Sequence, residues 1–199
     1  MNYTSFRSFL LFLISLVCLG ITSTACQDGQ QDLKVLKKIE KPFQFLDQDS
    51  SLVSEKDMMG KIHVTDFFFT TCPTICPVMK TQMLRVYDTY KDADDFVLLS
   101  HTIDPKHDTV GVLKNYAEGL GIESDKWHLV TGDKDAIYEM AETYMVVAEE
   151  DERAPGGFIH SGAFMLLDKN RQIRGIFDGT KEEEVDQLIK AIKQLQNEK

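Results

Sequence analysis

The stretch DFFFTTCPTICP, residues 66–77, joins an apolar run to two cysteines and a proline. The apolar run, Ile62–Phe69, ends in three consecutive phenylalanines, which is typical of a central strand buried on both faces. Pro77 suits the first turn of a helix, and apolar residues then recur at spacings of three and four. The stretch therefore predicts a buried strand that leads into a helix, with Cys72 and Cys76 at the junction.

The segments on either side alternate between strand and helix signals. Strands are expected at 96–100, 127–130, 163–167 and 172–177, and a β-hairpin at 43–53. Helical segments are expected at 54–59, 109–120, 133–144 and 180–195, the last one starting at a capping box formed by Thr180 and Glu183. Residues 148–158 are charged and contain glycine, which indicates an exposed loop or flap.

The order of these elements decides the fold class. Alternating strands and helices imply a parallel core, and the late pair of strands implies an antiparallel edge. We therefore expect an α/β protein with a thioredoxin-like fold, in which helices flank a mixed central sheet and the N-terminal β-hairpin forms an extension. In such sheets, sites form beyond the carboxyl ends of the strands, which is where Cys72 and Cys76 lie.

The charge of the chain excludes one class of partner. The 199 residues, a length that suits one domain with a short extension, include 32 acidic and 22 basic side chains, so the formal net charge is −10. A surface of this sign repels phosphates. We therefore expect no nucleic-acid partner.

Residues 1–25 resemble an export signal. They contain one basic residue, Arg7, no acid, and a short apolar run at 9–19. Small residues then lead to Cys26, as at a bacterial lipoprotein cleavage site, so Cys26 is a candidate for lipidation; a retained anchor or an ordinary cleaved signal are the alternatives. We expect residues 26–40 to be a tether and residues 41–199 to be the domain, exported to the cell envelope and held at the membrane.

Only Cys72 and Cys76 of the four cysteines fall in the expected domain. A disulfide between them would close too small a loop to stabilise the protein much, so the pair is expected to be chemical rather than structural. Their position at a helix start favours the thiolate. Two thiolates at this spacing can form a disulfide or bind one soft metal ion.

Two features favour the metal. Three residues separate the cysteines, whereas redox thioredoxins have two, and the strand at 163–167 is not preceded by the proline that redox domains place opposite their cysteines. His160 stands there instead. Two thiolates and one imidazole suit Cu(I), or Cu(II) with an added ligand, so His160 is a candidate third ligand.

Three motifs in this order resemble the Sco/SenC family: DFFFTTCPTICP (66–77), TIDPKHDT (102–109) and IHSGAFMLLD (159–168). The resemblance runs from about Phe43 to Leu195. It implies a thioredoxin-like fold and a copper site formed by Cys72, Cys76 and His160.

The resemblance also implies a function. Family members assist assembly of the dinuclear copper centre of cytochrome c oxidase, so the expected partners are the subunit that carries this centre and other copper carriers or thiol reductants. Members act by delivering copper or by reducing the receiving cysteines. The chain departs from the family at His107, where arginine is frequent, and at its lipoprotein-like start, where many members keep a transmembrane anchor.

The sequence also fits other interpretations. The chain is expected to be a copper metallochaperone rather than an enzyme; the alternative is a thiol–disulfide oxidoreductase with Cys72 and Cys76 as its redox disulfide. A peroxide-reducing enzyme would need an arginine by its thiolate, and Arg85 is the nearest in sequence. Asp104 is a candidate for orienting His160 or tuning the thiolates, with a turn aspartate as the alternative.

Overall fold

The computed structural model describes residues 33–198. One compact unit spans Leu33–Lys199, so the folded part begins ahead of Lys41, where the sequence placed the start of the domain. Leu33 and Ile39 are buried, and strand β1 (Lys37–Lys38) pairs with the last strand of the sheet. Residues 33–40 of the expected tether are therefore packed against the domain. Cys26 and the expected signal lie outside the described residues.

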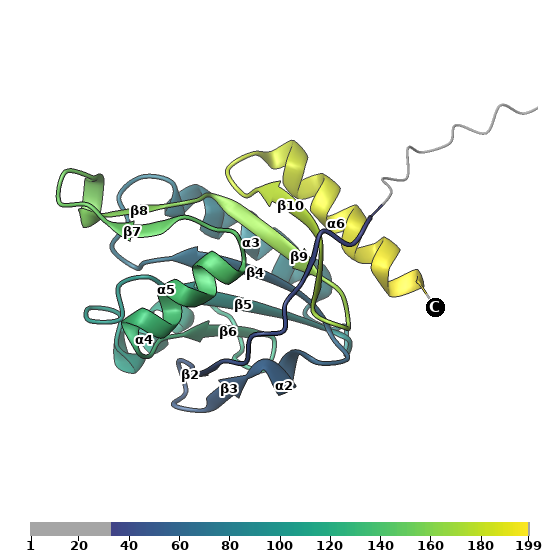
Figure 1. Ribbon diagram of the computed structural model, residues 1–199, viewed down its shortest axis with the longest axis horizontal. Coiled ribbons are helices and arrows are strands. Elements are labelled where there is room, and N and C mark those ends of the chain that lie inside the picture. Colours follow the sequence, from purple (N-terminus) through teal and green to yellow (C-terminus); the bar gives the residue numbers. More distant parts are fainter. Residues whose placement is uncertain (1–32, 199) are drawn as a thin grey trace, which may run out of the picture. The chain divides into compact units, whose positions relative to one another are not determined.

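A mixed sheet of six strands forms the centre of this unit, in the order β1-β10-β9-β4-β5-β6 (Figure 1). Its other strands are β4 (Ile62–Phe68), β5 (Phe96–Thr102), β6 (Trp127–Val130), β9 (Ala163–Leu167) and β10 (Gln172–Asp178). β4, β5 and β6 are parallel, whereas β9, β10 and β1 add antiparallel pairings. This is the predicted arrangement, a parallel core with an antiparallel side.

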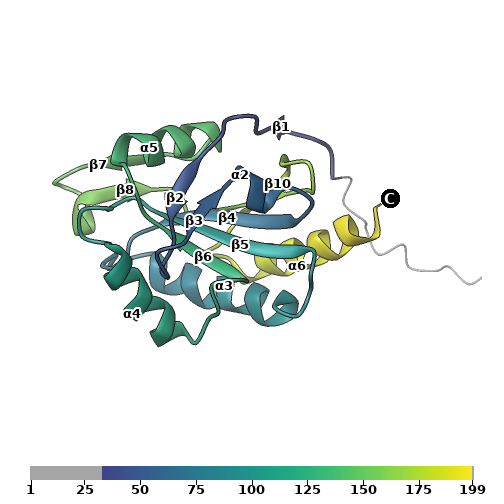
Figure 2. The same ribbon diagram turned by 90° about the horizontal axis from the view of Figure 1, so that it is seen from below.

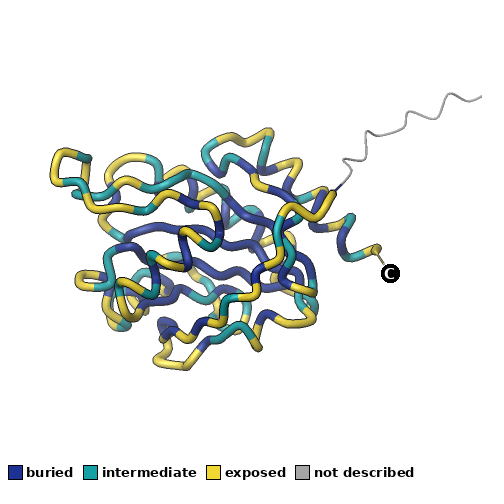
Figure 3. The backbone as a smooth tube through the Cα atoms, in the orientation of Figure 1, coloured by how far each residue is buried: buried dark blue, intermediate teal, exposed yellow. Residues whose placement is uncertain are grey.

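Helices cover the two faces of the sheet unequally. α3 (Cys76–Tyr90), α4 (Val110–Leu120) and α6 (Glu182–Asn197) lie on one face, and α5 (Lys134–Thr143) lies on the other (Figure 2). Successive crossovers that move in one direction across a parallel sheet stay on one face because each is right-handed. Every residue of β4 and β5 is buried between these layers (Figure 3).

The predicted N-terminal hairpin is present and packs on the same face as α5. It consists of β2 (Gln44–Leu46) and β3 (Leu52–Ser54), which pair antiparallel and bury Phe45 and Val53. The short helix α2 (Glu55–Met58) follows, capped by the side chain of Ser54. The buried side chains of the hairpin therefore cover part of this face of the sheet.

Two predictions about local structure were wrong. Residues 148–158 contain β7 (Ala148–Glu150), and β8 (Phe158–His160) pairs with it, so the expected loop is an antiparallel hairpin. The capping box at Thr180 does not form, because the Thr180 hydroxyl donates to Asp178 and α6 begins later, at Glu182. Within residues 33–198, none of the helices is long and apolar enough to cross a membrane.

Candidate metal centre

The junction between β4 and α3 places both cysteines at one end of the sheet. β4 ends at Phe68, and the chain then turns so that the N–H of Cys72 donates to the carbonyl of Phe69. Cys76 is the first residue of α3, and Pro77 follows it in the first turn. Cys72 thus lies in the loop and Cys76 on the helix, and both are buried, at 8% and 5% exposure.

A buried carboxylate fixes the start of the cysteine loop. Asp108, which is fully buried, accepts hydrogen bonds from the N–H and the hydroxyl of Thr70 and, at 2.6 Å, from the hydroxyl of Thr102. Thr102 ends β5, so these bonds tie the loop to the neighbouring strand. The position of Cys72, two residues beyond Thr70, is therefore set by the sheet as well as by α3.

The hairpin of β7 and β8 carries His160 to the cysteines. Its connection contains Gly156, whose φ is +81° and where a Cβ would come within 2.9 Å of the Phe69 ring. The Phe69 ring also contacts Phe158 and the imidazole of His160, with ring centroids 5.1 Å and 5.7 Å away. The glycine thus allows the hairpin to lie close over the start of the cysteine loop.

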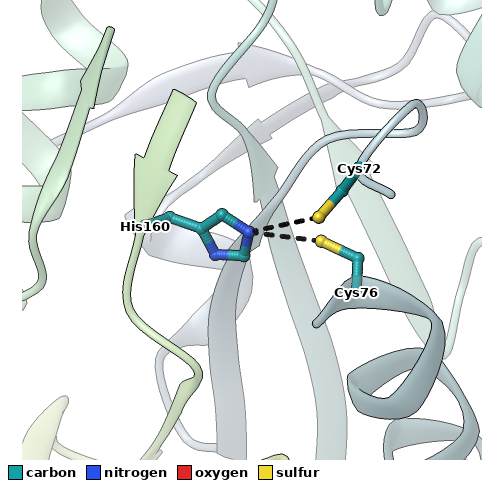
Figure 4. A group of neighbouring side chains, drawn as sticks. All are labelled: Cys72, Cys76 and His160. Carbon is teal, nitrogen blue, oxygen red and sulfur yellow. Dashed lines mark hydrogen bonds between the residues drawn. The ribbon is translucent and has the colours of Figure 1, made fainter. Parts of the chain in front are cut away.

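The imidazole of His160 points its Nε2 at both sulfurs (Figure 4). This nitrogen lies 3.3 Å from the Sγ of Cys76 and 3.8 Å from the Sγ of Cys72. The other ring nitrogen, Nδ1, lies 3.1 Å from the carbonyl oxygen of Ser161. A carbonyl accepts hydrogen bonds only, so Nδ1 carries a proton, and Nε2 is the ring nitrogen left to interact with the sulfurs.

The two thiols differ in their proton affinity. Burial alone would raise the pKa of Cys72, but hydrogen bonds from His160 and from backbone N–H groups outweigh it and lower that pKa to about 6. Burial, helped by the neighbouring Cys72 and Asp66, raises the pKa of Cys76 above its ordinary value. Both cysteines are free. Cys72 is therefore the thiol that ionises readily, and Cys76 is the thiol that stays protonated.

The three side chains fit a soft metal ion. Their ligand atoms lie within 4.8 Å of one another, and no other group of three or more His, Cys, Asp or Glu in the part of the chain described meets that test. Two sulfurs and one imidazole nitrogen are ligands that Cu(I) favours. The carbonyl of Ser161 holds the imidazole in the orientation that a metal ligand needs.

Asp104 does not join this cluster. Its backbone N–H donates to the hydroxyl of Thr102, and its carboxylate accepts a bond from the N–H of His107. The partner that orients His160 is a backbone carbonyl instead. The contacts of Asp104 are those of an aspartate that closes a turn, which was the alternative interpretation.

A different carboxylate, which was not predicted from the sequence, lies near the site. Asp66 lies on β4, is 5% exposed, and lines a small cavity together with Cys76. It opens the same motif that contains both cysteines, and a single acid within a run of apolar strand residues was the signal that could have identified it. Asp66 is thus a buried carboxylate that the fold places near Cys76.

The chain has relatives both in sequence and in structure. A sequence model described as SCO1/SenC matches residues 31–197. The SCO1 protein homolog of Bacillus subtilis (strain 168) is 28% identical over 172 residues, which cover 84% of this chain and 89% of the relative.

Solved structures agree with this assignment. A SCO1/SenC family lipoprotein from Bacillus anthracis superposes with a TM-score of 0.74 at 28% identity, over 81% of this chain and 97% of that one. BsSco, described as a cytochrome c oxidase assembly protein with a disulfide switch, has the same TM-score and identity over 85% and 100% of the two chains. Arabidopsis thaliana ScoI with copper bound is 27% identical, with a TM-score of 0.66 over 80% and 99%.

These matches confirm the thioredoxin-like fold and the resemblance inferred from the three motifs. The family model spans most of the chain and includes both cysteines and His160. The chain belongs to the SCO1/SenC family.

Proposed function

We propose that this protein binds one copper ion through Cys72, Cys76 and His160 and uses it in the assembly of the dinuclear copper centre of cytochrome c oxidase. The observation that carries the proposal is the convergence of these three side chains. They come from segments more than 80 residues apart in sequence, yet the Nε2 of His160 faces both sulfurs. Copper is the cargo in this account, and the protein supplies the ligands.

Relatives support the proposal. Structures of Sco proteins from Arabidopsis thaliana and from Bradyrhizobium japonicum contain copper, and BsSco is described as a member of a family of cytochrome c oxidase assembly proteins. We infer that the partner of this chain is the oxidase subunit that receives the copper. Other copper carriers would supply copper to the site, and thiol reductants would reduce a disulfide between its two cysteines.

The proposed place of action is the bacterial cell envelope. The apolar start of the chain and the small residues before Cys26 support export followed by lipidation of Cys26. The likeness to a SCO1/SenC lipoprotein of Bacillus anthracis supports the same inference. A lipid on Cys26 would hold the domain at the membrane, where the oxidase lies.

Metal analysis of the full chain tests the copper function. Reduced protein should bind one equivalent of Cu(I) against a competing chelator, and Cys72→Ser, Cys76→Ser and His160→Ala should each lower its affinity. His128→Gln is the matched control, because His128 lies on β6, its Nδ1 contacts Asp47, and it belongs to no part of the cluster. Equal copper affinity in the parent and in His160→Ala would refute the three-ligand site.

A second function, reduction of the partner's disulfide, is favoured by the two free thiols. Cys72 has a lowered pKa and would attack the partner disulfide, and Cys76 would then resolve the mixed disulfide. A reductase assay on an oxidised copper-centre domain separates the two functions. Turnover by metal-free protein, which in His160→Ala persists in alkaline solution where Cys72 still ionises, would favour the reductase.

The structure does not favour a peroxide-reducing enzyme. Such a reaction needs an arginine at the thiolate, and the guanidinium of Arg85 instead contacts Gln82 and Asp186. A peroxide reaction no faster than that of a free thiol is the result we expect in stopped-flow measurements.

A further inference from the structure

An open groove, called here the β10 groove, lies beside the three candidate ligands. It has a volume of about 420 Å³ and is lined by residues of the cysteine loop, of the start of β9 and of the end of β10. Ile75, which stands between Cys72 and Cys76 in the sequence, lines it, and so does Ser161, which directly follows His160. Its other lining residues include Gly162, Ile176, Asp178 and Thr180. The groove therefore adjoins the residues proposed to bind copper.

Gly162 lines the groove without a side chain. A Cβ at this position would come within 3.1 Å of the Cγ2 of Thr180 and 3.7 Å of the Cδ1 of Ile75. The φ of Gly162 is not positive, so other residues could adopt its backbone conformation. The glycine thus leaves open the space between the side chains of Ile75 and Thr180.

Part of the groove surface is apolar. Ile176, on β10, is 45% exposed, and Ile75 is only partly buried. Single exposed apolar side chains are ordinary on a protein surface, but these two line the same hollow beside the site. A partner that filled the groove would remove both side chains from water, which is favourable.

The rim of the groove is acidic. Asp178 lines it, and α6 begins just beyond with three consecutive glutamates, 182–184. The carboxylate of Glu184 accepts from the N–H of Asp178 at 2.7 Å, so the first turn of α6 is held next to the groove. Lys181, whose ammonium lies 3.0 Å from the carboxylate of Asp178, is the one basic residue of the stretch 178–184. This stretch therefore carries an excess of negative charge, which favours a positively charged partner.

We propose that the β10 groove docks an extended segment of the protein that receives copper or electrons from the site, and that this segment presents an apolar side chain next to a basic one. The apolar side chain would contact Ile75 and Ile176, and the basic one would face Asp178 and the start of α6. In both functions proposed above, an atom of the receiving protein must come within bonding distance of the cysteines. That protein therefore has to contact the surface that adjoins them. The inference rests on the proposed function for the identity of the receiving protein.

A second groove of similar size gives a contrast. It has a volume of about 390 Å³ and lies at the N-terminal hairpin, where Phe43, Gln44 and Lys56 are among its lining residues. None of its lining residues stands next to a candidate ligand in the sequence. Size does not distinguish the two grooves, and position beside the site selects the β10 groove.

Binding of the receiving protein to the metal-free full chain tests the β10 groove. The probe is the metal-free copper-centre domain of the oxidase subunit, and titration calorimetry gives its dissociation constant. Ile176→Lys removes the apolar side chain and adds a positive charge, so it should weaken binding about tenfold or more, as loss of a central interface residue does. The Cu(I) affinity of this variant should match that of the parent, because Ile176 is not a ligand.

Leu52→Lys is the matched control. Leu52 is also an apolar strand residue on the surface, at 63% exposure, but it lies on β3 and does not line the β10 groove. We expect this variant to keep the dissociation constant of the parent. An equal loss in both variants would mean that the charge of the whole surface, and not the groove, governs binding, and would overturn the proposal.

Ile176→Thr, which places a β-branched residue suited to a strand, repeats the test if Ile176→Lys does not fold. An unchanged dissociation constant in a folded Ile176 variant, or no binding by the parent, would overturn the proposal. Loss of binding in Val147→Lys but not in the Ile176 variants would also overturn it, because Val147 is exposed beside β7 and outside the groove.

Salt and copper test the remaining parts of the inference. Added salt should weaken binding, because it screens exposed charges; a dissociation constant that salt leaves unchanged would overturn the assignment of a basic partner. The binding measurement contains no metal, so its result is independent of copper affinity. Failure of the parent to bind copper would refute the proposed function and leave the docking result standing.

Discussion

His160 and His101 lie near the same end of the sheet, and their surroundings give them opposite roles. His160, at the end of β8, is partly exposed, and its Nε2 faces two sulfurs. His101, on β5, is fully buried on the face covered by α5 and the N-terminal hairpin, where its ring stacks on Phe67 at 4.8 Å and meets Phe45 edge-on. Of these two histidines, only His160 therefore has a ring nitrogen beside other atoms that can bind a metal.

A position near the end of a strand is therefore not enough to identify a metal ligand. His101 immediately precedes the TIDPKHDT motif and lies near the end of the buried strand β5, so its place in the sequence is similar to that of a site residue. In the structure its Nδ1 contacts the hydroxyl of Thr65, and its Nε2 has no hydrogen-bond partner. We therefore expect His160 to serve copper binding and His101 to serve stability.

The largest effect is expected from His160→Ala. Loss of a direct ligand should lower Cu(I) affinity by more than the roughly 10–100-fold that loss of a supporting residue costs. The side chain is partly exposed and forms no part of the core, so the thermal unfolding midpoint should remain close to that of the parent. Competition with a Cu(I) chelator and calorimetry measure the two quantities on the same preparation.

His101→Ala should show the reverse pattern. It leaves a cavity among aromatic rings, so unfolding free energy should fall by about 2–4 kcal/mol, as measured by urea denaturation. Cu(I) affinity at temperatures where the variant is folded should match that of the parent. A loss of affinity in the folded variant would contradict the division between the two histidines.

Acid should destabilise the folded protein through the buried histidines His63 and His101. Burial lowers the pKa of His63 to about 4 and that of His101 to about 3, whereas both titrate near 6.5 when the chain is unfolded. Between these values the unfolded state binds more protons, so stability falls as pH decreases from about 6.5 toward 3. Urea denaturation across this range should show a smaller pH slope for His63→Gln than for the parent.

The two thiols should react at different pH values. Ionisation of Cys72, whose pKa is lowered to about 6, should make its reaction with iodoacetamide rise through that pH, while Cys76 reacts only in more alkaline solution. Mass spectrometry of the labelled peptide locates the reaction. In His160→Ala the hydrogen bond to Cys72 is lost, so the midpoint should move upward; an unchanged midpoint would contradict the assigned role of His160.

The smallest effect is expected from Asp104→Asn. The contacts of Asp104 close the turn after β5 and do not include His160 or a thiol. Copper affinity should therefore remain within about twofold of the parent, against the 10–100-fold expected of a residue that supports a ligand. A larger loss would restore the role that the sequence suggested for Asp104.

The sequence predicted most of the fold because its core strands are unusually clear. The three phenylalanines before the cysteine loop identified β4, and the topology then placed Cys72 and Cys76 at the end of the sheet. His160 was predicted as a ligand with the help of the family resemblance. Its spacing alone gave no such information, because His160 lies 84 positions after Cys76 in the sequence.

Other features had weak or misleading signals. β1 contains only Lys37 and Lys38, and β7 is acidic and largely exposed, so neither shows the alternation of a half-buried strand. Both form through pairing with another strand, a non-local interaction. The spacing of Thr180 and Glu183 fits a capping box, but Asp178 offers the Thr180 hydroxyl a closer acceptor.

X-ray absorption at the copper edge of Cu(I)-loaded protein tests the central claim most directly. The parent should bind one copper ion with two sulfur ligands and one imidazole nitrogen. In His160→Ala the imidazole contribution should disappear, while in His101→Gln the spectrum should match that of the parent. A spectrum in which the imidazole contribution persists without His160 would contradict the account.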